Sequence, residues 1–280
     1  MSDLKNKVKD HWNSNPMDYD NIDVKQFSKE YYRQINQQFY KICYFGHKKG
    51  EPMFSKIVNY SSLKGKKVLE IGCGAGTMST EFAKHGAIVT AIDLTETAIK
   101  NTKNQFKFAN VKGKIMQADA ENLPFKDESF DYVWSWGVIH HTPDTRKCSS
   151  EIYRVLKKGG RAQVMLYHKN SIFNYLLVIG IRGILQGKLF KHGSKKLLNM
   201  YTDHSHIGGV PLAKCYSKKE VRNNLFKEFN KFNFKVYGVK NEVFFIPLFR
   251  KYLHKLPNSI PSFFLEKLGL GWYLLINMKK

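Results

Sequence analysis

The chain has 280 residues, of which 42% are hydrophobic, a composition typical of one large globular domain or two small ones. Its four cysteines lie far apart and form no CxxC pair, so they indicate neither a disulfide framework nor a structural zinc site. The net charge is +23 and is concentrated on residues 171–280, which favours an anionic partner for this part, or simply lysines on a solvated surface.

The N-terminal residues are charged and contain no apolar core, so they do not resemble a secretory signal. The longest apolar run, near residues 173–181, is about half of the roughly 20 residues that a membrane-spanning helix needs. Together with the dispersed cysteines, these features predict a cytoplasmic protein in a reducing setting, with peripheral contact to an anionic membrane left open.

Residues 1–60 are predicted to be helical and to form an N-terminal cap. Apolar side chains recur there at intervals of three and four, which is the spacing of one helix face: Phe27, Tyr31, Ile35, Phe39 and Ile42. Such a segment can cover a binding site or can pack as ordinary core.

Between residues 61 and 170 the pattern changes to alternating strands and helices. Predicted strands cover 66–71, 87–93, 112–119, 130–136 and 161–168, and predicted helices cover 77–86, 95–108 and 145–160. This alternation predicts a Rossmann-like, doubly wound, mostly parallel α/β sheet with its ligand at the carboxyl ends of the strands. Residues 171–280 are predicted to supply a helix at 217–229, strands at 232–240 and 272–279 that complete seven strands, and two long substrate-binding insertions.

The first predicted strand of this unit runs into glycines at every second position, in KKVLEIGCGAGT. Gly72, Gly74 and Gly76 form GxGxG, so the third glycine comes one residue too early for a dinucleotide fingerprint. A phosphate-loop motif is also absent from the sequence. The glycines alone predict only that a ligand approaches the backbone closely at a strand–helix turn.

Two acidic residues at the ends of the following strands narrow the choice of ligand. Asp93 is placed to accept the hydroxyl groups of a ribose. Asp119, followed by the small residue Ala120, suits the edge of an adenine ring, with the carboxylate accepting from the amino group. Either acid alone could merely cap the next helix. The order of all three features in one unit favours an adenosine.

These segments are similar to the sequential motifs of class I S-adenosylmethionine-dependent methyltransferases. The match rests on VLEIGCGAGT, AIDLTETAI, QADAENLPFKDESFDYVWS and EIYRVLKKGG, while SWGVIHHTPDT and MLYHKNS resemble the branch with ubiquinone and menaquinone methyltransferases. The resemblance implies S-adenosylmethionine as cofactor, with Glu70 at its amino-acid end and Trp136, on the loop after the fourth strand, near the sulfonium. The candidate cofactor-binding residues are Glu70, Gly72, Gly74, Gly76, Thr77, Asp93, Leu94, Thr95, Asp119, Ala120, Glu121 and Trp136.

Three histidines are predicted to open onto the carboxyl-end face of the sheet. His140 and His141 follow the fourth strand and His168 ends the fifth, where a neutral histidine can take a proton from a phenol or a thiol. Tyr167 could orient the methyl acceptor. Alternatively, His140 and His141 only shape their loop. His204 and His206 have a metal-binding spacing but no third ligand, so no metal is expected.

Aromatic rings can hold a sulfonium cation, and Trp12, Tyr31, Tyr32, Trp134 and Trp136 are the candidates, although each can equally be core. The sequence SWGV replaces the NPPY-type motif that clamps a base amine, so nucleic acid is a disfavoured substrate. The insertions at 171–198 and 244–270 mix apolar and basic residues, which favours a small, apolar or lipid-like acceptor of a methyl group on O, S, N or C. A peptide or protein side chain, or a non-catalytic scaffold that only holds the cofactor, remains as an alternative. The oligomeric state is not indicated.

Overall fold

The structure is a computed structural model that describes residues 3–16, 22, 24–203, 205–239, 242 and 257–280. The strands are β1 (Lys67–Ile71), β2 (Ile88–Asp93), β3 (Lys114–Gln117), β4 (Phe130–Trp136), β5 (Leu156–His168), β6 (Cys215–Tyr216), β7 (Lys231–Tyr237) and β8 (Tyr273–Lys279). The helices are α1 (Asp3–Ser14), α2 (Lys29–Ile42), α3 (Thr77–Lys84), α4 (Glu96–Ala109), α5 (Thr145–Val155), α6 (Lys188–Tyr201), α7 (Lys218–Glu220) and α9 (Ser259–Lys267), with π-helical segments at Phe173–Leu185 and Val221–Leu225.

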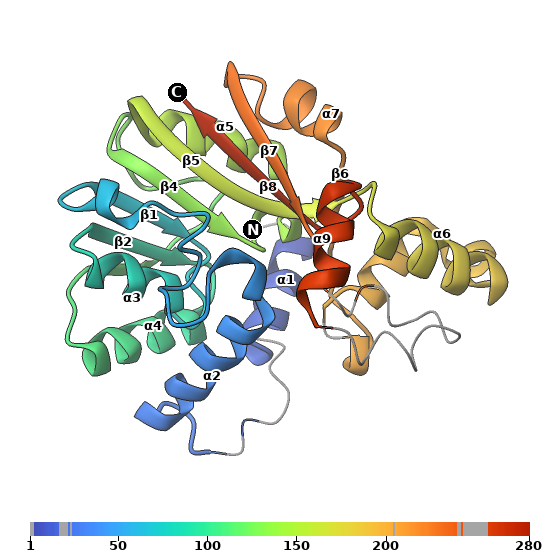
Figure 1. The fold of residues 1–280 in the computed structure, drawn as a ribbon, viewed down its shortest axis with the longest axis horizontal. Helices are drawn as coiled ribbons and strands as arrows, with labels where there is room; N and C mark the ends of the chain where they lie inside the picture. Colours follow the sequence, from blue (N-terminus) through green and yellow to red (C-terminus); the bar gives the residue numbers. More distant parts are fainter. Residues whose placement is uncertain (1–2, 17–21, 23, 204, 240–241, 243–256) are drawn as a thin grey trace.

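All the strands belong to one sheet (Figure 1), in the order β3-β2-β1-β4-β5-β8-β7, with β6 pairing with β5 outside this path. The pairs among β1 to β5 are parallel, whereas β8 is antiparallel to both β5 and β7. The predicted fold class, a doubly wound and mostly parallel α/β sheet, is therefore confirmed. The two-residue strand β6 was not indicated by the sequence.

Alternate residues of the central strands pack on opposite faces of the sheet, because successive side chains of a strand point to opposite sides. On one face Val68 and Trp134 belong to a core with residues of α3 and α4. On the other face Leu69 and Val133 pack with residues of α5 and the segment Val221–Leu225. Both faces are covered, so ligands can reach the sheet only at the strand ends.

Two predicted helices are shorter than the sequence pattern suggested. The helix predicted for 145–160 ends at Val155, because Leu156 already pairs with Phe130 as the first residue of β5. The helix predicted for 217–229 begins with a Ser217 cap but changes to a π-helical segment and ends at Leu225. Of the predicted strand 232–240, Lys240 lies outside the described residues, as do His204 and residues 243–256 of the second insertion.

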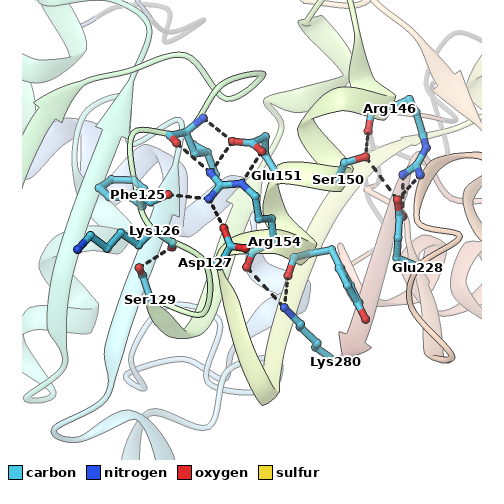
Figure 2. Close-up of polar contacts among 12 residues, drawn as sticks. Phe125, Lys126, Asp127, Ser129, Arg146, Ser150, Glu151, Arg154, Glu228 and Lys280 are labelled. Atoms are coloured by element: carbon cyan, nitrogen blue, oxygen red, sulfur yellow. Dashed lines mark hydrogen bonds and ion pairs between the residues drawn. The ribbon is translucent and has the colours of Figure 1, made fainter.

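A polar cluster fastens the loop between β3 and β4 to α5, as Figure 2 shows. The Arg154 guanidinium donates to the carbonyl oxygens of Leu123 and Phe125 and pairs with the carboxylates of Glu151 and Asp127. Glu151 in turn accepts a hydrogen bond from the Leu123 amide. Because charged hydrogen bonds to backbone groups are among the stronger polar contacts, this cluster anchors the loop that begins at Asp119.

Within the described part of the chain, no helix combines the length and the apolar character needed to cross a membrane.

Candidate cofactor and acceptor site

The turn after β1 has a backbone that only glycine tolerates. Gly72 has a φ of +77°, and a Cβ there would lie 2.1 Å from Cγ2 of Val138, on the segment after β4. Gly76 caps the start of α3 with a φ of +83°, and its Cβ would lie 2.8 Å from the Cα of Thr102. The glycines therefore allow the backbone of the turn to lie in close contact with Val138 and Thr102.

Two buried carboxyl groups flank this turn. Glu70 in β1 accepts a hydrogen bond from the Ser79 hydroxyl of α3, and burial raises the pKa of its carboxyl to about 8. Asp93 at the end of β2 accepts hydrogen bonds from the Gly74 amide at 3.2 Å and from the Thr95 amide and hydroxyl at 2.9 Å. Burial raises the pKa of Asp93 as well. Both carboxyls are thus held in fixed positions at the turn.

A third acidic position follows β3. Asp119 lies two residues beyond the strand, not at its end as predicted, and one of its carboxylate oxygens accepts from the Glu121 amide. The Lys5 ammonium of α1 lies 2.7 Å from the Asp119 carboxylate and 2.5 Å from that of Glu121. The neighbouring Ala120 is 8% exposed.

These groups share one cavity of about 270 Å³ at the carboxyl ends of β1, β2 and β4. Ten of the twelve residues that the sequence predicts for cofactor binding line it: Glu70, Gly72, Gly74, Thr77, Asp93, Leu94, Thr95, Asp119, Ala120 and Trp136. The other two do not line it. Gly76 faces Thr102 instead, and the Glu121 carboxylate is directed to Lys5 and to the Asp144 amide.

The chemistry of this lining fits S-adenosylmethionine. A buried carboxyl at Glu70 suits an ammonium group, Asp93 suits a ribose hydroxyl, and the Asp119 carboxylate suits an adenine amino group. The turn that only glycine tolerates supplies the close backbone approach that a nucleoside needs. When bound, this cofactor supplies an activated methyl group on a sulfonium.

The other end of the same cavity is largely aromatic. Trp136 is the last residue of β4 and not a loop residue as predicted, yet its side chain lines the cavity together with Trp12 of α1. The Trp12 ring meets the His141 ring edge-on, with centroids 5.2 Å apart. These faces provide an apolar and electron-rich boundary for a cationic or aromatic ligand.

His141 is the one predicted catalytic residue that lines the cavity. Its Nδ1 lies 2.6 Å from the carbonyl oxygen of Leu212, which can only accept, so Nδ1 carries a proton and Nε2 is the basic atom of the neutral ring. Nε2 lies 3.3 Å from the Asp203 carboxylate, which also accepts a hydrogen bond of 2.5 Å from the Tyr167 hydroxyl. Tyr167 thus reaches the cavity only through Asp203.

The expectation that all three histidines open onto this face is wrong for His140 and His168. His140 is fully buried with its ring centroid 3.9 Å from that of Tyr167, and burial lowers its pKa well below the usual value. His168 pairs with the Gly271 carbonyl and faces a separate hollow beside Lys169 and Glu220. Neither lines the cavity, so neither is placed to exchange a proton with a substrate bound there.

Three of the five candidate aromatic residues also lie elsewhere. Trp134 is fully buried on the α3–α4 side of the sheet, and Tyr32 donates from its hydroxyl to Asn101 of α4. Tyr31 packs edge-on against Tyr32. Their apolar surfaces serve the core rather than the cavity.

Two residues of the site were missed by sequence reasoning. Asp203 lies directly beside His204 in the stretch that was considered for metal binding, but nothing local pairs it with His141, 62 positions earlier. Lys5 is one of many lysines, and its contact with Asp119 joins elements 114 residues apart. Among the described residues, no group of three or more histidine, cysteine or acidic side chains is arranged around a metal position.

The comparisons with known proteins agree with this geometry. Residues 69–164 match the family model described as a methyltransferase domain. The chain is 33% identical over 119 residues to a ubiquinone biosynthesis O-methyltransferase of Coxiella burnetii, covering 42% of this chain and 51% of that protein. It is 36% identical over 110 residues to a phthiotriol/phenolphthiotriol dimycocerosates methyltransferase of Mycobacterium tuberculosis, covering 39% and 40%.

The chain spans about half the length of the curated relatives it matches. Among solved structures it is similar to a possible histamine N-methyltransferase of Thermotoga maritima, with a TM-score of 0.51, 18% identity and coverage of 89% and 98% of the two chains. At this identity the likeness concerns the fold alone.

Proposed function

We propose that the chain, whose residues 69–164 match a methyltransferase-domain model, transfers the methyl group of S-adenosylmethionine to a hydroxyl group of a small, apolar molecule. One observation carries this proposal. The acidic residues suited to an adenosine and the His141–Asp203 pair line the same cavity.

In this proposal the cofactor lies between Glu70, Asp93 and Asp119, with its sulfonium toward Trp136. Glu70 takes the ammonium of the amino-acid end, Asp93 a ribose hydroxyl, and Asp119 with the Ala120 amide the adenine edge. These contacts align the activated methyl group and exclude water from it. These cofactor contacts would be the same for any methyl acceptor. The choice of acceptor therefore depends on the residues at the other end of the cavity.

His141 acts as the general base at that end. Its Nε2 would take the hydroxyl proton of the acceptor during the transfer, for which the bound cofactor would supply the activated methyl group. The Leu212 carbonyl holds the ring in the tautomer with its proton on Nδ1, and the Asp203 carboxylate, 3.3 Å from Nε2, would stabilise the imidazolium that forms. Tyr167 orients Asp203 through its hydrogen bond.

The apolar lining supports the choice of acceptor. The residues that line the cavity include Trp12, Trp136, Val138 and Phe39, which suit a ring or an alkyl chain rather than a sugar. Both curated relatives have names that refer to lipid-like or quinone-related molecules, which is consistent with such an acceptor for this chain.

A radiolabelled methyl donor tests the proposal. Incubated with a cell extract and wild-type protein, the label should enter the organic-solvent fraction, whereas label only in RNA or protein would contradict the acceptor class.

The variant His141→Gln should lower the rate of labelling by about 10²–10⁴-fold, since this is the usual contribution of a general base. Cofactor binding should persist in this variant, because His141 is placed at the acceptor end, and an unchanged rate would remove His141 from the mechanism.

The protein is further proposed to meet its acceptor at an anionic membrane surface. The π-helical segment Phe173–Leu185 and α6 form a helical hairpin that projects from the sheet on the side away from α3 and α4 (Figure 1). At its turn Leu185 is 80% exposed and Phe190 is 89% exposed. Residues 169–202 contain six lysines and arginines and no acidic residue, so an apolar tip is surrounded by positive charge, as in interfacial helices.

A further inference from the structure

Helix α1 borders the cavity and contributes few side chains to the hydrophobic core. Val8, Lys9 and Trp12 line the cavity from above, and Figure 1 shows α1 beyond the carboxyl end of β4. Val8 is the one buried residue of the helix, and Trp12 is partly buried against a small core cluster. An element that buries so little apolar surface opens locally at small cost.

The cavity beneath α1 is small for its proposed ligand. Its volume of about 270 Å³ lies just below the roughly 300–1,000 Å³ that is usual for small-molecule sites. It is bounded by the strand ends below and by α1 above. Movement of α1 away from the strand ends would widen the cavity for a ligand of the size of S-adenosylmethionine to enter or leave.

Polar contacts fasten α1 to the loops that form the cavity wall. The Asn13 side-chain oxygen accepts from the Thr97 amide at 3.1 Å, and Lys9 lies 3.7 Å from the Glu96 carboxylate, both at the start of α4. The strongest contact is that of Lys5, whose side chain is 12% exposed and reaches Asp119 and Glu121 together. Burial lowers the pKa of Lys5, but the two carboxylates outweigh burial and the pKa lies above its usual value.

Lys5 thus occupies the carboxylate that is proposed to receive the adenine amino group. Both are donors directed at Asp119, so they compete for its oxygens. Glu121 does not line the cavity and would keep its contact with Lys5 when the ligand is present. The Asp119 carboxylate is therefore the one that binds the ligand, and the Glu121 carboxylate is the one that holds Lys5 of α1.

We propose that α1 is a lid over the cofactor cavity and that Lys5 is its latch, which bridges Asp119 and Glu121 when the cavity is empty and keeps Glu121 when the adenine amino group takes Asp119. The identity of the ligand in this proposal rests on the proposed function. The Lys5 latch does not, because it consists of contacts within the ligand-free protein.

Hydrogen exchange of residues 3–14 in the ligand-free protein tests the latch. Lys5→Met should raise the exchange rates of these amides by about tenfold or more, because removing one partner of a buried ion pair is strongly destabilising to the closed state. Lys7→Met is the matched control, since Lys7 lies on the same helix, is 64% exposed and pairs only with Asp3 in the contacts observed. Lys5→Arg should restore slow exchange. Equal rates in Lys5→Met and wild type would overturn the latch.

Release of S-adenosylhomocysteine, followed by stopped flow, tests the lid. Lys5→Met should accelerate release by about tenfold or more, and Lys7→Met should leave it unchanged. If wild type binds the ligand but Lys5→Met releases it at the wild-type rate, the lid is wrong and the proposed function stands. If neither S-adenosylmethionine nor its demethylated product binds to wild type, the proposed function fails, and the exchange experiment still decides the latch.

Discussion

At the scale of single residues, the site depends on carboxyl groups that the fold removes from water. Glu70 is 4% exposed and is hydrogen-bonded by the hydroxyl and the backbone of Ser79. A charged carboxylate is costly in such a place, which is why burial raises the pKa of Glu70 to about 8. Glu70 is therefore protonated near neutral pH in the ligand-free protein, and the ammonium group that we propose to bind beside it would favour loss of that proton.

This burial has a consequence for stability that the variant Glu70→Gln measures. The pKa of Glu70 is about 8 in the folded protein and about 4.5 in the unfolded chain, so the folded state binds more protons between these values and stability falls as pH rises from about 5 to 8. The variant carries no charge at any pH and should lose less stability over this range, by on the order of 3 kcal/mol at pH 8. Denaturant unfolding at both pH values measures the difference, and parallel pH profiles would contradict a buried neutral Glu70.

At the scale of elements, the sequence predicts regular structure well where local pattern and tertiary packing agree. The strands β1 and β4 are each followed by a glycine and β2 ends in an acid, and all three were predicted to within about a residue. The end of α5 was misplaced because the strand partner of Leu156 is Phe130, which local pattern does not reveal. Likewise, the separation of His141 from His140 depends on which side of a short 3-10 turn, Ile139–His141, faces the cavity.

The hairpin of Phe173–Leu185 and α6 is the element on which the membrane proposal depends. Co-sedimentation with vesicles containing anionic lipid should be strong at low salt and weak with neutral vesicles. Replacing the three exposed lysines of α6 should weaken vesicle binding on the order of a hundredfold. Replacing the two apolar tip residues with serine should also weaken vesicle binding, although the net charge stays the same. The variants are Lys191→Gln, Lys195→Gln and Lys196→Gln together, and Leu185→Ser with Phe190→Ser.

The control has the same loss of charge on the opposite side of the molecule: Lys103→Gln, Lys107→Gln and Lys112→Gln, on and after α4. This variant should bind vesicles like wild type. Equal weakening in both triple variants would mean that only net charge matters. Binding of single-stranded RNA that depends on the α6 lysines, without binding of anionic vesicles, would contradict the membrane proposal.

At the scale of the whole molecule, the sheet brings together groups that are far apart in the chain. The cofactor half of the cavity comes from residues 70–120, which is the part that the sequence motifs identified. The half proposed for the acceptor combines α1, the turn after β4 and Asp203, because the first residues of the chain and the segment that ends at Asp203 lie at the strand ends. Contacts such as Lys5–Asp119 and His141–Asp203 leave no periodic trace in a single sequence, so the cofactor could be predicted from it and the acceptor end could not.

The account as a whole depends on the cavity binding an adenosine-containing methyl donor through Asp93, and titration calorimetry measures this directly. Both S-adenosylmethionine and S-adenosylhomocysteine should bind the wild-type protein with a Kd of roughly micromolar or below, and Asp93→Asn should weaken both by about 10–100-fold through loss of a charged hydrogen bond. Absence of binding to wild type, or equal binding by the variant, would contradict the central claim.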